Sequence, residues 1–390
     1  MKSPTDVSSS LVELECLRCG SRQAPALDAY LCKQCAGLPG DPGVLDARYD
    51  YAAAKASLGS ETAASTGLGR YAALLPPLPE RGAWALQPGD TPLFEAPRLA
   101  AELGLARLWI KDETRNPTRC LKDRATFVAV GMAKLAGRDT LYCASAGNAA
   151  ISLAAFCAWG GMRCHVFVPR RVTPKRLSWL RAYGATIHIS EGDYDAAYDE
   201  AEAAGRAEGW YSRNCALNPY LVEGKKTLAF EVVEQLGGEV PDWVLAPVGD
   251  GCTLSAIGKG FREMREIGRS DRLPRLAGVQ AEGIQPVVAR FAGEPDPGQR
   301  PTRAASIAIG RPRNALRVLH EVRHSEGTFL AVPDRAMRSA QRTLATHAGV
   351  VAELTSAASL AALERLAKDG RLRGQTALLV ITGGRAEEIG

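Results

Sequence analysis

The chain has 390 residues, with a hydrophobic fraction of 46%, a charged fraction of 23% and a formal net charge of +5. This length exceeds what one hydrophobic core usually supports, so we expect two lobes or more. The most basic stretch, Arg300 to Arg323, is interrupted by apolar residues, unlike the concentrated patch of a nucleic-acid binder. We interpret it as a solvated face, with a site for a phosphorylated or carboxylated small molecule as the alternative, and we predict no nucleic-acid partner.

The first residues, Met1 to Asp6, lack the apolar segment of a secretion signal, and no uncharged apolar run is long enough to span a membrane. We therefore expect a cytoplasmic protein with no membrane partner. In a reducing compartment, its ten cysteines are expected to bind metal or to be buried rather than to form disulfides.

Four of the cysteines form two CxxC pairs, Cys16 with Cys19 and Cys32 with Cys35, and twelve residues separate the pairs. Each pair can place two thiolates on one side of a tight turn, and together they can form the closed tetrahedral cage of a structural Zn²⁺ site. Unconnected cysteines or a redox pair are the alternatives. We predict a zinc-ribbon-like N-terminal extension over residues 1–45, followed by an arm or linker over residues 46–90.

From about Thr91, short apolar runs alternate with helical stretches. The predicted strands are 108–110, 140–143, 164–168, 186–189, 243–246, 276–280 and 376–381, and the predicted helices are 121–136, 148–159, 174–183, 193–207, 221–236, 253–266, 334–346 and 356–368. This alternation predicts an α/β fold with parallel sheets and helices on both faces. We expect lobes at 91–220 and 221–390, with ligand-binding loops at the carboxyl ends of the strands.

Several loop residues have the chemistry of a cofactor site. Lys122 follows a strand at the amino-terminal edge of a helix, where a lysine either acts as a nucleophile or faces solvent. Gly249 and Gly251 let backbone N–H groups approach an anion, and Thr253 opens a helix whose N-terminus favours phosphate. Taken alone, a glycine loop is also typical of a plain turn, and Asn148 is also typical of a helix N-cap.

These loops together resemble a known family. Residues 116–124 resemble the Asn-Pro-Thr-x-Ser-Phe-Lys-Asp-Arg motif of threonine synthases, which belong to the tryptophan-synthase-β-like (fold type II) pyridoxal-phosphate (PLP) enzymes. Three further site segments agree, in the family's order, at residues 145–150, 247–253 and 380–383, and outside the site residues 221–227 and 349–358 also resemble the family. The resemblance covers residues 91–385, and the CxxC pairs are also found in some members. Several ordered motifs are far more specific than one alone.

The resemblance implies the two open, twisted parallel sheets of fold type II enzymes and a role for each loop. It implies that Lys122 carries PLP as a Schiff base, that Asn148 contacts the cofactor's phenolic oxygen and that Thr382 hydrogen-bonds the pyridine nitrogen. The implied phosphate-binding residues are Gly249, Asp250, Gly251, Cys252 and Thr253. The implied substrate-binding residues are Ser145, Ala146, Gly147, Ala149, Lys111 and Thr118.

By the same resemblance we expect a lyase of amino-acid biosynthesis that converts O-phosphohomoserine and water to threonine and phosphate, and we expect a homodimer. The Lys122 amine, once freed, is expected to remove the substrate's Cα proton. The candidates for binding the substrate phosphate are Lys111, Arg119, Arg124 and Lys225.

Departures from the family pattern keep other activities open. Cys120 and Leu121 replace Ser-Phe, and Ala146 and Ala149 replace threonines. β-Replacement on an activated serine, as in synthases of cysteine, cysteate or diaminopropionate, is therefore an alternative, and so is β-elimination as in serine and threonine dehydratases. A third alternative is a zinc-ribbon protein that binds nucleic acid or a partner and has an inactive α/β body. The intact set of Lys122, Asn148 and Thr382 argues against it.

Overall fold

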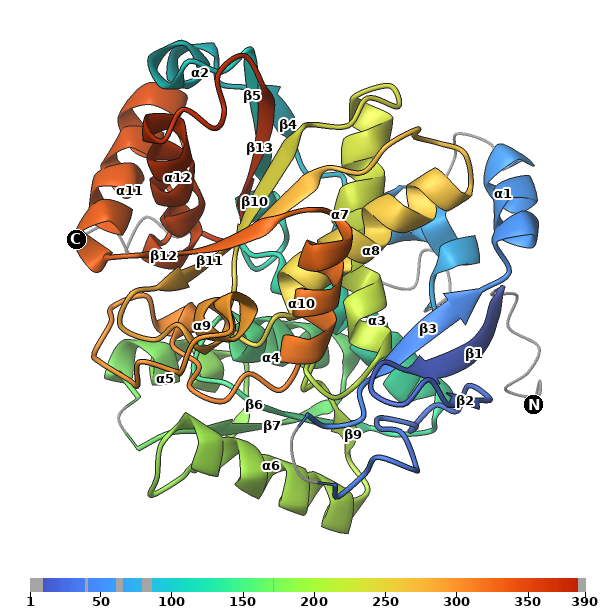
Figure 1. Ribbon diagram of the computed structural model, residues 1–390. Coiled ribbons are helices and arrows are strands. Elements are labelled where there is room, and N and C mark those ends of the chain that lie inside the picture. The colour runs from blue at the N-terminus through green and yellow to red at the C-terminus, as the bar shows by residue number, and fades with distance from the viewer. Residues whose placement is uncertain (1–9, 39–40, 61–65, 79–85, 171, 385–390) are drawn as a thin grey trace. The chain divides into compact units, whose positions relative to one another are not determined.

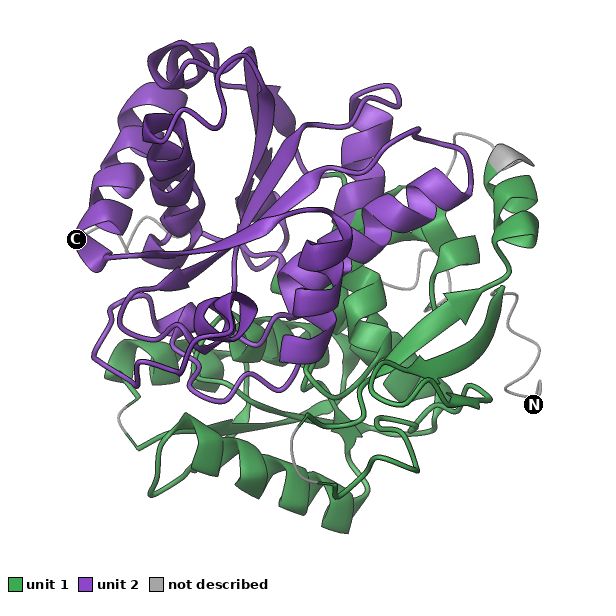
Figure 2. Ribbon diagram, in the orientation of Figure 1, with its two compact units in different colours: residues 1–90, 122–227 green, residues 91–121, 228–390 purple. Residues whose placement is uncertain are grey.

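The computed structural model describes residues 10–38, 41–60, 66–78, 86–170 and 172–384. Its contacts divide the chain into two compact units, which are coloured separately in Figure 2. Unit 1 contains residues 1–90 and 122–227, and unit 2 contains residues 91–121 and 228–390. The bounds of these units differ from those of the predicted lobes, because the segment Thr91–Leu121 clusters with the second half of the chain.

A parallel sheet with the strand order β8-β7-β6-β9 forms the centre of unit 1. Its strands are β6 (Thr140–Ala144), β7 (Arg163–Val168), β8 (Thr186–Ile189) and β9 (Tyr211–Ser212). Around it pack α3 (Lys122–Leu135), α4 (Asn148–Gly160) and α5 (Pro174–Ala182) on one side and α6 (Tyr194–Glu208) on the other (Figure 1). Every residue of β6 is buried, as expected for a strand that helices cover on both faces.

The amino-terminal part of unit 1 is an antiparallel sheet with the order β2-β1-β3. The elements here are β1 (Leu11–Cys16), β2 (Arg22–Gln23), β3 (Leu45–Tyr49), α1 (Tyr51–Ser60) and the 3-10 helix η1 (Gly67–Leu74). Parts of the predicted arm, residues 61–65 and 79–85, lie outside the described residues. The rest of the predicted arm includes most of β3 and both of these helices.

Unit 2 has a sheet with the strand order β12-β11-β10-β13-β5-β4, in which β4 alone among the described strands runs antiparallel to its neighbour. The strands are β4 (Leu93–Glu95), β5 (Arg107–Asp112), β10 (Trp243–Pro247), β11 (Arg275–Ala281), β12 (Thr328–Val332) and β13 (Thr376–Ile381). One face carries α2 (Pro97–Leu103), α11 (Asp334–Ala348) and α12 (Leu354–Lys368), and the other carries α8 (Cys252–Glu266) and α10 (Ala315–His324) (Figure 1). The remaining elements are α7 (Tyr220–Gln235), α9 (Pro286–Ala292), η2 (Glu113–Arg115) and η3 (Ala305–Ile307).

The predicted alternation of strands and helices, and with it the α/β fold with parallel sheets, is confirmed. In the α/β body the sequence analysis missed the strands β4, β9 and β12 and the short helices α2, α9 and α10, and in the amino-terminal part it missed β1, β2, β3 and α1. Among the described residues, none of the helices combines the length and the apolar character that a membrane-spanning segment needs.

Helices α3 and α7 come into close contact at Gly224, inside the family-like segment 221–227. A Cβ atom at Gly224 would lie 2.2 Å from the carbonyl oxygen of Arg124. The fully buried Arg124 guanidinium donates from Nη1 to Thr227 Oγ1 at 2.9 Å, and this hydroxyl donates to the Gly224 carbonyl at 2.8 Å. Glycine is therefore required here because two helix backbones approach each other, and the motif has a packing role.

Replacing Gly224 with alanine is expected to lower the free energy of unfolding by about 1–3 kcal/mol, the usual cost of overpacking a core. This loss outweighs the gain in helix propensity of about 1 kcal/mol, because the neighbouring atom belongs to a backbone that cannot rotate away. The measurement is urea denaturation. Gly69→Ala is the matched control, since a Cβ there meets nothing within 4 Å; equal losses in the two variants would contradict the packing argument.

Candidate cofactor and substrate site

The carboxyl edge of the sheet in unit 2 gathers three of the predicted loops. β10, β13 and β5 are neighbouring parallel strands, so the residues that follow them lie at the same edge. Direct contacts join two of these loops: the Leu121 N–H donates to the Thr382 carbonyl at 2.9 Å, and Cys120 forms an antiparallel bridge with Gly383. The chain continues from Leu121 directly into Lys122.

The loop after β10 is shaped to receive an anion. Gly251 has a φ of +98°, which other residues rarely adopt, and a Cβ there would lie 2.8 Å from Val318 Cγ1 and 2.9 Å from the Asn314 carbonyl oxygen. A Cβ at Gly249 would lie 3.0 Å from the carbonyl oxygen of Ser306. α8 begins at Cys252, directly after Gly251. The first N–H groups of a helix have no intrahelical acceptors, so they favour a negatively charged ligand.

Residues just before α10 pack on this loop and were missed by the sequence analysis. Asp250 Oδ1 accepts the Arg313 backbone N–H at 3.2 Å, and Asn314 Nδ2 donates to Cys252 Sγ at 3.5 Å. Arg313 is 9% exposed and Arg317 is 3% exposed, so the prediction of a solvated face over 300–323 is wrong at these positions. The apolar spacing of Ala315, Val318, Leu319 and Val322 was the signal that could have revealed the buried helix.

Thr382, which follows β13, is 6% exposed and is held by Ser356. The two side-chain oxygens lie 2.9 Å apart, and Ser356 Oγ also accepts from the Gly383 N–H at 3.0 Å and donates to the Gly383 carbonyl at 2.9 Å. Either hydroxyl can be the donor in this pair. When Ser356 donates to Thr382 instead, the Thr382 proton remains to be donated to a ligand.

Lys111, predicted to bind substrate, lies in a fully buried network. Its ammonium donates to Glu231 Oε2 at 2.8 Å, to Gln235 Oε1 at 2.8 Å and to the Thr91 carbonyl at 2.7 Å. These acceptors match the three donors of an ammonium group. The geometry gives Lys111 a structural role in unit 2 and offers no support for its predicted contact with the substrate.

Thr118, also predicted to bind substrate, is buried, and its Oγ1 lies 3.4 Å from Cys120 Sγ. Arg119, between them, is exposed and has a φ of +62°. A positive φ in a non-glycine residue costs free energy and is most often kept at functional sites. Among the basic residues considered for the substrate phosphate, Arg119 is therefore better placed than the buried Lys111.

In unit 1, Lys122 and Asn148 are the first residues of two packed helices, α3 and α4. One turn further along each helix, Ser152 Oγ donates to Thr126 Oγ1 at 2.7 Å, so the two helices begin at the same end of unit 1. Arg213, 3% exposed, donates to Thr126 Oγ1 and to the Lys122 carbonyl, each at 3.2 Å. Arg213 was missed by the sequence analysis, and it fixes the first turn of the helix that carries the lysine.

The predicted substrate loop follows β6 and leads into α4. Ser145 Oγ accepts the Gly147 N–H at 3.1 Å, and Ala146, Gly147 and Ala149 are partly exposed, as binding of a ligand by the backbone requires. The remaining candidates for the substrate phosphate in unit 1, Arg124 and Lys225, are 0% and 2% exposed. Arg124 already bonds to Thr227.

A family model described as "Pyridoxal-phosphate dependent enzyme" matches residues 85–383. The threonine synthase of Methanosarcina acetivorans is 36% identical over 379 residues, which cover 96% of this chain and 91% of that protein. That of Methanocaldococcus jannaschii is 36% identical over 95% of this chain and 91% of its own length. The chain belongs to the threonine synthase family of PLP-dependent enzymes. Threonine synthase of Mycobacterium tuberculosis is 35% identical over 76% of this chain and 81% of its own length.

Solved structures confirm the fold of the family. Threonine deaminase isoform 2 from Solanum lycopersicum superimposes with a TM-score of 0.66 at 17% identity, over 77% of this chain and 85% of that one. Maize serine racemase gives a TM-score of 0.64 at 18% identity, over 76% of this chain and 90% of that one. At these identities the likeness concerns the fold alone.

The residues of this family member fit PLP within each unit. Unit 2 offers a glycine cradle at a helix N-terminus for a phosphate, and it holds the Thr382 hydroxyl at the end of a neighbouring strand. The Asn314 Oδ1 atom is buried beside this cradle without a hydrogen-bond partner among the described residues. Unit 1 offers a partly buried lysine and an asparagine at adjacent helix starts.

The four predicted zinc ligands come together in the amino-terminal sheet of unit 1. Their sulfur atoms all lie within 4.8 Å of one another, with Cys16 and Cys35 at 3.9 Å and Cys19 and Cys32 at 3.8 Å. Zn–S bonds of about 2.3 Å in a tetrahedron place sulfurs about 3.8 Å apart, so the cluster has the dimensions of a zinc cage. Hydrogen bonding by the Ser21 hydroxyl lowers the pKa of Cys19 to about 6, whereas burial raises the pKa of Cys16 and that of Cys35, so a metal ion would have to stabilise those two thiolates.

Proposed function

We propose that this chain is a threonine synthase, which uses PLP to convert O-phosphohomoserine and water to threonine and phosphate. The observation that carries the proposal is the 36% identity to archaeal threonine synthases over at least 95% of the chain. The region matched by the family model, residues 85–383, also contains Lys122, Asn148, the glycine loop and Thr382. The threonine deaminase and serine racemase structures share the fold at much lower identity.

PLP supplies, when bound, an electron sink for bond breaking at the substrate's Cα. Lys122 would hold the cofactor through its amine, and the free Lys122 amine would be the base that takes the substrate's Cα proton and returns protons to the carbon chain. By the family resemblance, the backbone N–H groups of residues 249–253 would hold the cofactor phosphate, Asn148 would donate to the phenolic oxygen, and Thr382 would donate to the pyridine nitrogen. Arg213 orients Lys122 through its carbonyl.

The test incubates PLP-loaded protein with O-phosphohomoserine and measures phosphate, threonine and keto acid together. We expect equal amounts of phosphate and threonine and no keto acid. Phosphate with a keto acid would instead indicate a dehydratase-like elimination. A yellow cofactor band without phosphate release would overturn the assignment of O-phosphohomoserine as the substrate. Because Ala146 and Ala149 replace the usual threonines, O-phosphoserine and O-acetylserine would then be tested.

We also propose that the four cysteines hold one structural Zn²⁺. Replacing Cys32 with serine is expected to remove the metal and to lower the melting temperature, because a structural zinc site contributes directly to folding. Elemental analysis and thermal unfolding are the measurements. Cys215→Ser, outside the cluster, is expected to keep the metal; a wild-type protein without zinc, or a Cys32→Ser variant that keeps it, would contradict the proposal.

The family resemblance further supports a cytoplasmic homodimer as a proposal. Sedimentation equilibrium of the purified protein is expected to give twice the chain mass of 41.5 kDa.

A further inference from the structure

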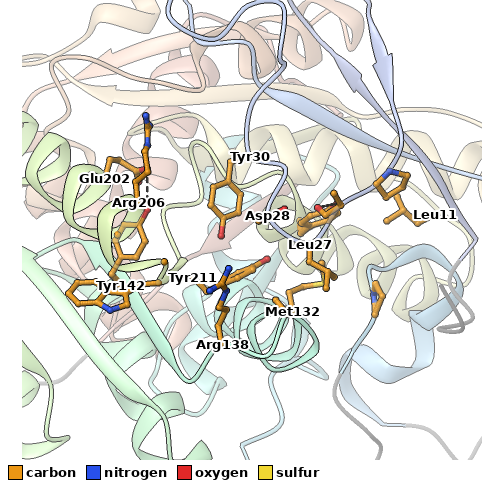
Figure 3. A pocket seen from close by; sticks show the side chains of 18 residues that line it. Leu11, Leu27, Asp28, Tyr30, Met132, Arg138, Tyr142, Glu202, Arg206 and Tyr211 are labelled. Atoms are coloured by element: carbon orange, nitrogen blue, oxygen red, sulfur yellow. Dashed lines mark hydrogen bonds between the residues drawn. The ribbon is translucent and has the colours of Figure 1, made fainter. Parts of the chain in front are cut away.

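A cavity in unit 1 contains none of the residues assigned above to PLP, substrate or metal. Its volume is about 850 Å³, within the range of about 300–1,000 Å³ that is usual for small-molecule pockets. It lies between the amino-terminal segment, which contributes Asp28 and Tyr30, and the α/β body, which contributes Arg138, Tyr142 and Tyr211 (Figure 3).

Hydrogen bonds across this cavity hold its walls together. The Ser212 N–H donates to Tyr30 Oη at 3.1 Å, and Tyr220 Oη donates to the Ala26 carbonyl at 2.7 Å. The rings of Tyr30 and Tyr211 meet edge to face, with centroids 5.8 Å apart. The cavity is therefore formed before any ligand enters, and aromatic rings make up much of its wall.

Polar groups at the cavity lack partners of their own. Tyr211 is 1% exposed, yet its hydroxyl makes no hydrogen bond of normal geometry within the described part of the chain. The nearby amide of Asn218 donates one N–H to the Ser212 carbonyl and accepts the Tyr220 N–H, and it lies close to the Tyr211 hydroxyl without a bond of normal geometry. A buried hydroxyl with no well-formed hydrogen bond costs free energy, so a ligand that accepts its proton would be favoured here.

Two charged side chains at the cavity, in addition to the Tyr211 hydroxyl, are available to contact a ligand. The guanidinium of Arg138 makes no hydrogen bond or ion pair with any described residue, and neither does the carboxylate of Asp28. Arg138 lies against Gly209, a further lining residue, since a Cβ there would be 3.1 Å from its Nη1. Figure 3 shows Arg138, Tyr211 and Tyr30 converging on one region of the cavity.

We propose that this cavity binds a free α-amino acid with a large apolar or aromatic side chain. The planar guanidinium of Arg138 matches a carboxylate, and the Tyr211 hydroxyl donates to the same group. Asp28 matches the ammonium group, and the aromatic walls take the side chain. This site is separate from the residues of the proposed threonine synthase reaction and does not depend on that proposal.

Calorimetric titration of the full-length, PLP-loaded protein with L-phenylalanine tests the proposal. We expect saturable binding that Arg138→Gln weakens by about 10- to 100-fold, the range for one lost charge-assisted hydrogen bond. Lys134→Gln is the matched control, because Lys134 lies near the end of α3, four residues before Arg138, is exposed, is not among the residues lining the cavity and loses the same charge. Phenethylamine, which lacks the carboxylate, is expected to bind more weakly than L-phenylalanine and to be indifferent to Arg138→Gln.

Tyr211→Phe gives a second test whose two effects have opposite signs. It is expected to weaken L-phenylalanine binding about 3- to 10-fold, and to raise the melting temperature of the ligand-free protein, because it removes a buried hydroxyl without a partner. A misfolded variant would instead show both weaker L-phenylalanine binding and a lower melting temperature. The absence of saturable binding, equal losses in Arg138→Gln and Lys134→Gln, or binding that survives Arg138→Gln and therefore occurs elsewhere, would each overturn the proposal.

Discussion

Replacing Lys122 with alanine is expected to lower the rate of phosphate and threonine release by at least about 10³-fold, since general acid–base catalysis alone contributes about 10²–10⁴-fold. Because Lys122 is the residue proposed to carry the cofactor, the variant is also expected to lose its covalent attachment. Its PLP is therefore expected to be removed by dialysis, and the lysine-dependent absorbance band is expected to be missing. Single-turnover kinetics and absorbance spectra are the two measurements.

Lys134→Ala, on the exposed face of the same helix, is the control for a lost lysine in α3. It is expected to keep the band and the rate. A Lys122→Ala variant that turns over at the wild-type rate would show that another amine does the chemistry. A variant that is inactive but keeps the covalent band would assign the Schiff base to a different lysine.

Replacing Gly251 with alanine is expected to weaken PLP retention by about tenfold or more, because strain of about 1–3 kcal/mol falls on the loop proposed to bind the phosphate. Alanine is strained at a φ of +98°, and its Cβ would press on the Asn314 carbonyl and on Val318. The loop must shift, and the N–H groups at the start of α8 then point away from the phosphate. Equilibrium dialysis of PLP measures the effect.

Gly238→Ala is a closely matched control. Gly238 has a φ of +97° and lies in the turn after α7, where a Cβ would stand 3.4 Å from the Arg269 carbonyl. This variant carries the same backbone strain at a position away from the phosphate loop, so it is expected to lose folding stability and to keep PLP affinity. Equal PLP affinities of the two variants would mean that Gly251 serves the fold alone.

The long elements were predictable because each carries its own signal. The helix from Lys122 and the buried strand Thr376–Ile381 were both found from local apolar patterning, and their ends differ from the prediction by a residue at most. The same patterning was overlooked for α10, because arginine and histidine side chains lie between its helically spaced apolar positions. Burial of Arg313 and Arg317 depends on packing against the glycine loop more than sixty residues earlier, which local patterning does not report.

Individual side-chain roles were less predictable than the loops that hold them. Lys111 lies near the carboxyl end of β5, where ligand-binding residues are expected. Its acceptors Glu231 and Gln235 lie 120 and 124 residues further along the chain, so local sequence did not reveal them. The role of Arg213 could not be predicted for the same reason, because Arg213 and the Lys122 carbonyl that it contacts are 91 residues apart in the sequence. The glycines were the exception, because a left-handed turn before a helix restricts the choice of residue locally.

The position of β13 has a consequence for how the protein is made. In the sheet of unit 2, β13 lies between β10 and β5, yet it leaves the ribosome after every other described strand. Until then the nascent chain exposes two unpaired strand edges, which are prone to misassembly, and pairing over such a sequence separation is slow. The bond from Leu121 to Thr382 also waits for this strand. The loop that leads directly into Lys122, the proposed cofactor lysine, is thus among the last parts of the molecule to be completed during synthesis.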